Sequence, residues 1–276
     1  MKLNNSDLFR GLNPMSIRIN TRGPKNGRCN ICGAYGKLTE DHTPPKGCLK
    51  PTQVEIRHLV ELLSNETGST KGRLSQNGVK YRTICARCNN NFLGTKYDPE
   101  LIYFVNSVGQ LLRSPIHLPP VLTVRAKPQS ILRSLVGHMS AQGVDRYEKG
   151  NLTEALRDYF LDPTLPLPNG LNAFYWAYPH RSHIMFRDAA YLDIRVGNPF
   201  AFWMLKFFPI AFMITWDKPT PLDHHISTFE SWRNIPFDAA VDIPITLRPI
   251  PPVHWPETPT DYTMILYGQE AVYIKS

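Results

Sequence analysis

The sequence contains no apolar run long enough to cross a membrane as a helix. The best candidate, residues 200–216, is interrupted by Lys206 and Pro209, whereas a spanning helix needs about 20 apolar residues. We therefore expect this segment to form a buried pair of strands. Residues 1–10 also lack the apolar stretch of a secretory signal. Both absences favour a cytoplasmic protein that does not associate with membranes.

Cysteines are few, and the sequence shows neither an internal repeat nor heptads. In the cytoplasm disulfides are rare, so a disulfide scaffold is not expected. Four of the five cysteines form two Cys-x-x-Cys pairs, Cys29 with Cys32 and Cys85 with Cys88. Two such pairs complete the tetrahedral thiolate site that typically holds structural Zn²⁺. The remaining cysteine, Cys48, is expected to be a small buried residue.

Acidic residues are scarce in one part of the chain only. The formal net charge is +8, and residues 1–100 hold 16 Lys and Arg against 8 Asp and Glu. Residues 101–276 hold the remaining 15 of each (31 − 16 and 23 − 8), so the whole excess lies in the first part. A basic region attracts phosphate backbones, which favours nucleic acid as the partner.

The chain is expected to be an α+β protein. Apolar spacing and start signals predict helices at 52–63, 98–113, 128–142 and 152–161. A polar lead-in is expected over residues 1–28 and a mobile surface loop over 64–79. After residue 170, β-branched and aromatic segments punctuated by Pro, Gly and Asn predict a mainly antiparallel sheet. The Pro-rich stretch at 113–128 suggests two parts, 1–114 and 115–276.

One motif between the cysteine pairs carries the chemistry. Residues 38–46 read LTEDHTPPK, and the second cysteine pair runs straight into Asn89. A carboxylate beside a histidine, shortly after Cys-x-x-Cys, is unusual in a purely structural zinc finger. Residues 29–98 resemble the Cys₄-zinc branch of the HNH endonucleases. That resemblance implies a zinc-stapled ββα-metal (treble-clef) module.

The resemblance also implies roles for individual residues. His42 matches the general base that takes a proton from the attacking water, a task suited to a pKa of about 6.5. Asp41 and Asn89 match the ligands of a catalytic divalent metal, and their oxygen atoms suit Mg²⁺ or Mn²⁺. The asparagine in the middle of the motif is left open between Asn77, Asn90 and Asn91. Phosphate contacts are expected from Lys46, Arg87 and Lys96.

The leading hypothesis is therefore a metal-dependent endonuclease that acts on double-stranded DNA, as in restriction or phage defence. One alternative is an RNase, since nothing in the sequence reads a 2′-hydroxyl. Another is a non-catalytic zinc module that binds nucleic acid or protein. Residues 115–276 are expected to recognise the substrate, a signal, a partner protein or a second copy of the chain.

Overall fold

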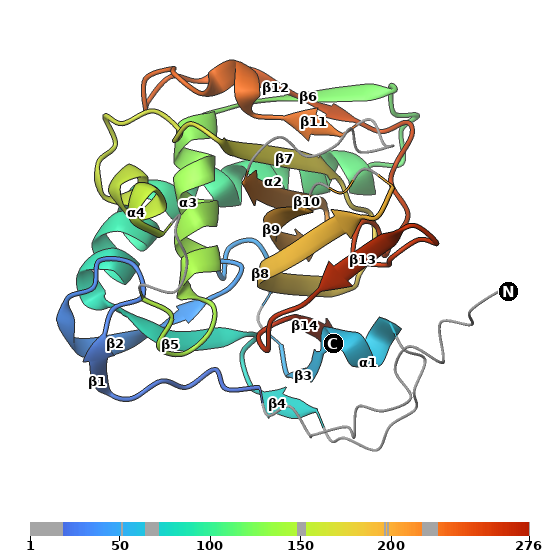
Figure 1. Cartoon of the computed structure of the whole chain (residues 1–276). Helices are drawn as coiled ribbons and strands as arrows, with labels where there is room; N and C mark the ends of the chain where they lie inside the picture. Colours follow the sequence, from blue (N-terminus) through green and yellow to red (C-terminus); the bar gives the residue numbers. More distant parts are fainter. Residues whose placement is uncertain are drawn as a thin grey trace, which may run out of the picture.

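The structure, a computed structural model, describes residues 19–50, 52–63, 72–147, 153–195, 197, 199–216 and 226–275. Helices and strands are mixed, and every strand pair within the three sheets is antiparallel (Figure 1). The sequence-based expectation of a mixed protein with mainly antiparallel sheets is therefore confirmed.

A small sheet of three strands lies at the candidate site. It consists of β1 (Asn26–Arg28), β2 (Tyr35–His42) and β5 (Lys80–Cys85), in the order β1-β2-β5. After β5 the chain enters the π-helix η1 (Arg87–Tyr97), which continues directly into α2 (Asp98–Arg113). The small sheet and this long helical segment therefore meet where the second cysteine pair lies.

A nine-stranded sheet forms most of the remaining structure, in the order β11-β7-β10-β9-β8-β14-β3-β4, with β13 paired to β8. Its strands are β3 (Val54–His58), β4 (Arg73–Ser75), β7 (Leu171–Ala177), β8 (His183–Asp193), β9 (Pro199–Phe207), β10 (Ile210–Trp216), β11 (Ser227–Thr228), β13 (Thr263–Leu266) and β14 (Val272–Lys275). Because β14 pairs with β3, strands from both predicted parts of the chain share one sheet. One apolar core likewise contains residues from both parts, from Cys29 to Ile274.

The expected helix at 52–63 is wrong over its first half. Residues Val54, Ile56 and His58 are buried and alternate with less buried neighbours, which is the period of a strand. Strand β3 is held on both sides, by β14 and by β4, and only the short α1 (Leu59–Leu63) is helical. Tertiary pairing thus overrides a spacing that also fits a helix.

Two other expectations fall partly outside the described residues. Residues 1–18 of the predicted lead-in and 64–71 of the predicted loop belong to the parts that the structure does not describe. Within the rest of the lead-in lie β1 and a bridge between Arg22 and Arg82. The rest of the loop forms β4 and a tight turn, so it is regular structure rather than an irregular flap.

Three predicted helices are confirmed, namely α2, α3 (Pro128–Ala141) and α4 (Thr153–Leu161). Pro99 occupies the first turn of α2, where a missing amide hydrogen costs nothing. Within the Pro-rich stretch, β6 (Val121–Ala126) pairs with β12 (Val241–Thr246) in a separate two-stranded sheet. The short 3₁₀ helix η2 (Glu230–Trp232) follows β11.

Helix α3 is buried along its whole length and stands upright in the centre of Figure 1. It packs against the small sheet, η1, α2, α4 and strands β8 and β9. Its polar residues therefore need partners inside the protein. The guanidinium of Arg133 donates to the carbonyl oxygens of Tyr159, Asp162, Pro163 and Leu165.

The apolar run at 200–216 forms β9 and β10, a hairpin in which both strands are almost entirely buried, as expected. Its one charged residue, Lys206, is fully buried and bonds to both carboxylate oxygens of Glu257, at 2.7 and 2.8 Å. No helix among the described residues has the length and apolar character needed to cross a bilayer.

Candidate functional site

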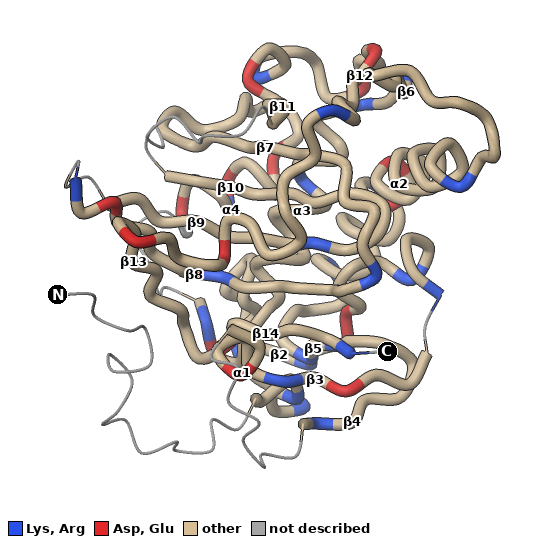
Figure 2. The backbone as a smooth tube through the Cα atoms, turned by 90° about the vertical axis from the view of Figure 1, so that its right-hand side faces the viewer, with Lys and Arg blue, Asp and Glu red and all other residues tan. Residues whose placement is uncertain are grey.

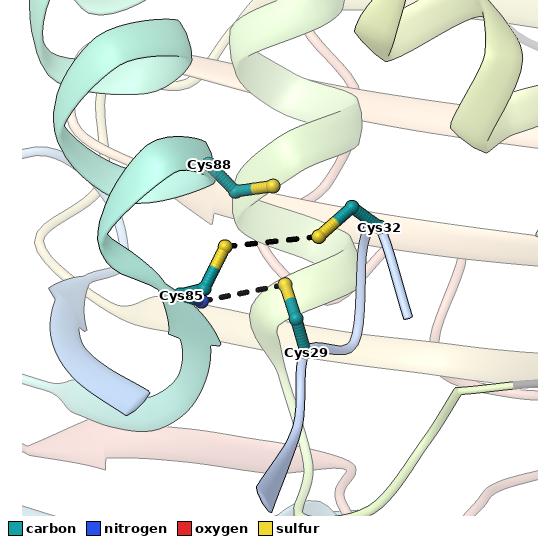
Figure 3. A group of neighbouring side chains, drawn as sticks. All are labelled: Cys29, Cys32, Cys85 and Cys88. Carbon is teal, nitrogen blue, oxygen red and sulfur yellow. Dashed lines mark hydrogen bonds between the residues drawn. The ribbon is translucent and has the colours of Figure 1, made fainter. Parts of the chain in front are cut away.

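Four cysteines converge where the small sheet meets η1. Cys29 and Cys32 lie in the turn between β1 and β2, Cys85 ends β5, and Cys88 lies in the first turn of η1 (Figure 3). Their sulfur atoms all lie within 4.8 Å of one another. A Zn–S bond of about 2.3 Å implies sulfurs about 3.8 Å apart in a tetrahedron, and Cys32 and Cys85 are separated by 3.7 Å. The cluster can therefore hold a metal ion, and its donors fit structural zinc.

The backbone around the first cysteine pair prepares this geometry. The amide nitrogens of Cys29 and Gly33 bond to the carbonyls of Ala34 and Cys29, each at 3.0 Å, which closes a tight turn. Gly33 has φ +73°, a conformation that favours glycine over residues with side chains. Across the cluster, the amide of Cys85 donates to the sulfur of Cys29 at 3.3 Å. The turn thus aims both sulfurs of the first pair at the second.

His42, the expected general base, ends β2 and is half-buried. Its Nε2 lies 3.0 Å from the carbonyl oxygen of Asn77. A carbonyl can only accept, so Nε2 carries the proton and the Nδ1 lone pair of the neutral ring stays free. Burial and the charge of Lys46 lower the pKa of His42 below its ordinary value. The ring is therefore unprotonated at Nδ1 near neutral pH and can accept a proton there.

Asn77 reaches His42 through its backbone. It lies in the turn that follows β4 and has φ +62°, a left-handed conformation that asparagine tolerates better than most residues. The turn is anchored by the Ser75 hydroxyl, which donates to Gly78 O at 2.8 Å, and by the Gly78 amide, which donates to Thr52 O at 2.7 Å. Of the three asparagines considered for the middle of the motif, Asn77 is the one that contacts His42. The other two, Asn90 and Asn91, are exposed on η1.

Asp41 is directed into the protein instead. Its Oδ2 accepts a hydrogen bond from Nδ1 of His138 at 2.8 Å, and Nε2 of the same ring donates to Oδ1 of Asp98 at 2.9 Å. Burial alone would lower the pKa of His138, but the two carboxylates raise it to about 10, so the ring is an imidazolium. The Ser134 hydroxyl donates to the same Asp98 oxygen at 2.7 Å. Neighbouring residues on a strand face opposite sides, which separates Asp41 from His42.

Asn89 joins η1 to β2. Its amide nitrogen donates to the hydroxyl of Thr39 at 2.9 Å and to the carbonyl of Glu40 at 3.0 Å, where β2 shifts register against β5. The acidic ligand expected for the catalytic metal is thus bonded to His138, and the amide ligand secures a strand. The Asp41 carboxylate is therefore directed away from His42, whereas these Asn89 bonds engage its amide nitrogen and not its oxygen.

His42 opens onto a cleft of about 1010 Å³. Four exposed cations line it, Lys46 and Lys50 from the segment after β2, Arg113 at the end of α2, and Arg181 before β8. None of the described residues that line the cleft is acidic, and no described carboxylate forms an ion pair with any of the four cations. The cleft is therefore suited to anions. Lys and Arg, with some Asp and Glu among them, also lie around β3, β4 and β14 (Figure 2).

The three cations expected to contact phosphate lie in different places. Lys46 lines the cleft. Arg87 lies over the ring of Phe92 at 5.4 Å, and Lys96 lies 5.3 Å from the ring centre of Phe237, both outside the cleft lining. Sequence reasoning assigned no role to four residues that the structure places in or next to the site, namely Arg113, His138, Arg181 and His183. His138 carried a signal, because it lies on the same face of the predicted helix as Ile131 and Leu135, where a buried polar side chain needs a partner.

Comparison of the chain with known protein families, with curated proteins and with solved structures found no match. The resemblance to the HNH endonucleases therefore depends on the motif residues between Cys29 and Asp98 alone.

Proposed function

We propose that this protein hydrolyses phosphodiester bonds in nucleic acid, with His42 as the general base and a structural zinc at the four cysteines. The observation that carries the proposal is the hydrogen bond from His42 Nε2 to Asn77 O, which leaves Nδ1 free beside a cationic cleft. In this proposal β2, β5 and η1, stapled at their ends by zinc, form the ββα-metal (treble-clef) module that the sequence predicts.

The chemistry assigned to the chain's own residues is limited and specific. Nδ1 of His42 removes a proton from the water whose oxygen bonds to phosphorus; the P–O bond to the leaving sugar oxygen breaks, and that oxygen takes up a proton from solvent. Lys46 and its cationic neighbours stabilise the negative charge that grows on the phosphate. This stabilisation is strengthened because the cleft holds no described carboxylate that would compete for the cations. DNA remains the leading substrate and RNA the alternative, with a restriction or phage-defence role as the corresponding biological proposal.

The test is cleavage of matched DNA and RNA, single- and double-stranded, with Mg²⁺, with Mn²⁺ and with EDTA. Replacing a general base lowers rates by about 10² to 10⁴-fold, so we expect that loss for His42→Gln. The exposed His117, which does not line the cleft, provides the matched control His117→Gln. Cleavage that survives His42→Gln unchanged would overturn the assignment of the base.

A non-catalytic nucleic-acid-binding module is the second candidate. It is favoured by one observation, the bond between Asp41 and His138, which leaves the expected metal ligand occupied. This candidate predicts that nucleic acid binds in EDTA and that no substrate is cut with any metal. The cleavage panel above therefore separates the two functions.

A further inference from the structure

Among the described residues, two buried polar atoms in the lining of the cleft beside His42 have no hydrogen-bond partner, the Thr43 hydroxyl oxygen and Nε2 of His183. His183 begins β8 and is only 7% exposed. Burial lowers the pKa of this histidine to about 3, so the ring is neutral. A buried polar group without a partner costs about 1–3 kcal/mol, and a ligand group that bonds to it recovers that cost.

The positively charged residues that line the cleft with His183 indicate that the ligand is an anion. Arg181 is two residues away in the chain and also lines the cleft, as does Arg113 at the end of α2. Lys46 and Lys50 belong to the N-terminal part of the chain, in the segment that follows β2. Four cations and one neutral hydrogen-bonding ring match a ligand with several negative oxygen atoms, as phosphate groups have.

An aromatic ring accompanies the cations. Phe208, in the turn between β9 and β10, is half-buried in the cleft lining, and the guanidinium of Arg113 lies 4.6 Å from the centre of its ring. Grooves that bind single-stranded nucleic acid combine cations along the backbone path with aromatic faces for the bases. The cleft volume, about 1010 Å³, is at the upper end of the range of about 300–1,000 Å³ for small-ligand pockets. It can therefore take more than one nucleotide.

The depth of His183 decides between a single strand and a duplex. A duplex is a rigid rod whose phosphates meet exposed groups, such as Arg181. His183 lines the same cleft but is buried, so a ligand group that bonds to its Nε2 has to enter the cleft rather than lie across it. A single strand is flexible enough to insert a phosphate there.

We infer that this cleft binds the phosphates of single-stranded nucleic acid, and that residues 115–276 supply part of the binding site through Arg181 and His183. The inference rests on the proposed function for its choice of nucleic acid as the ligand. It assigns a role to residues 115–276, and it narrows the substrate of the proposed nuclease site to single-stranded nucleic acid.

The experiment measures binding of a labelled short single strand, and of the duplex of the same sequence, to the full chain carrying His42→Gln, which leaves the cleft charge unchanged. Binding is followed by fluorescence anisotropy over a range of salt concentrations. Each phosphate contact on a single strand contributes about −0.7 to the slope of log K against log salt. We expect Arg113→Ala and Arg181→Ala each to reduce the slope by about 0.7, and Arg125→Ala, an exposed arginine outside the cleft, to leave it unchanged.

His183→Phe gives a sharper test, because it keeps an aromatic ring and removes both ring nitrogens, among them the unpartnered Nε2. Replacing an unsatisfied buried polar group by an apolar one is neutral or stabilising. We expect weaker binding together with an unchanged or higher melting temperature. Weaker binding with a lower melting temperature would mean that His183 is only a packing residue, and would overturn its role.

Competition with inorganic phosphate shows whether the cleft recognises free phosphate or the phosphates of a nucleic-acid strand. Tighter binding of the single strand than of the duplex, with weak competition by phosphate, supports the inference. Tighter duplex binding, or phosphate binding without oligonucleotide binding, overturns it. Cleavage of the same strand is measured with the chain that keeps His42. If the single strand binds through these residues but is never cut by that chain, the proposed function fails and this inference stands. If it is cut while the cleft variants bind normally, the inference fails alone.

Discussion

Nε2 of His42 and the carbonyl oxygen of Asn77 lie 3.0 Å apart, and this contact fixes which nitrogen of the imidazole is free. The two residues belong to different strand ends, β2 and β4, that are not neighbours in any sheet. The contact is therefore made by a turn and not by strand pairing. On the other side of β2, the carboxylate of Asp41 bonds to the buried ring of His138.

The backbone at Asn77 can be tested separately from its side chain. Glycine adopts φ +62° without strain, so Asn77→Gly should retain cleavage. Valine is strained there by about 1–3 kcal/mol, so Asn77→Val should displace the carbonyl and lower kcat about tenfold or more. Rates measured for both variants, with circular dichroism to check folding, decide this. Equal losses in the two variants would point to the amide side chain instead.

Cleavage should depend on pH through His42. The active form is the unprotonated ring, and the pKa lies below the ordinary value of 6.5 because of burial and the charge of Lys46. The kcat/KM profile should therefore rise from acid pH, reach half its plateau below pH 6.5 and stay level through neutrality. Lys46→Gln removes a positive charge, so it should move the midpoint upward. A midpoint well above 6.5 in the unmodified chain would rule out His42 as the base.

The buried imidazolium of His138 should support the fold. Breaking a buried ion pair costs about 3–5 kcal/mol, so His138→Gln should lower the free energy of unfolding by that order. The folded pKa of about 10 exceeds the unfolded value of 6.5. The stabilisation is thus complete below pH 6.5, declines as the pH rises from there and is lost above about 10. Urea unfolding at several pH values should show the difference between variant and parent narrowing with pH. A constant difference would mean that the ring is neutral in the folded protein.

Asp41 distinguishes a structural role from metal ligation. In the structure its carboxylate accepts a hydrogen bond from His138, so Asp41→Asn should lower the free energy of unfolding. Because both residues belong to one interaction, the losses of stability in Asp41→Asn and His138→Gln should not be additive. Unfolding measurements on both single variants and the double variant give this coupling. A stable Asp41→Asn variant that has lost metal-dependent cleavage would instead support the ligand role implied by the HNH resemblance.

Zinc binding should be coupled to folding at the cysteine cluster. The apparent binding free energy of structural zinc is about 10–16 kcal/mol in small zinc modules, so Cys29→Ser or Cys88→Ser should abolish zinc binding and unfold the surrounding sheet. Cys48→Ala is the control, because Cys48 is buried but lies outside the cluster. Metal content and thermal melting are the measurements. Loss of zinc with an unchanged melting profile would contradict the coupling.

The sequence by itself determined the features that depend on short spacings. The two-residue gap within each cysteine pair brings two sulfurs to one side of a turn, and the cluster follows from that geometry. Helices α2, α3 and α4 follow from apolar stripes and from start and stop residues that are close in the chain. The buried hairpin of β9 and β10 follows from an apolar run that is broken by a turn at Pro209.

The tertiary structure decided the features that depend on partners far apart in the chain. The segment Val54–His58, whose apolar spacing also fits a helix, forms β3 because it pairs with β14, which lies more than 200 positions further along the chain. Asp41 binds His138, 97 residues away, and His42 shares its cleft with Arg181 and His183 from the C-terminal part. A local pattern shows which groups carry charge or donate protons. Burial and long-range pairing decide which of those groups stay free to react, because inside a protein a polar group must be satisfied by whichever neighbour the fold provides.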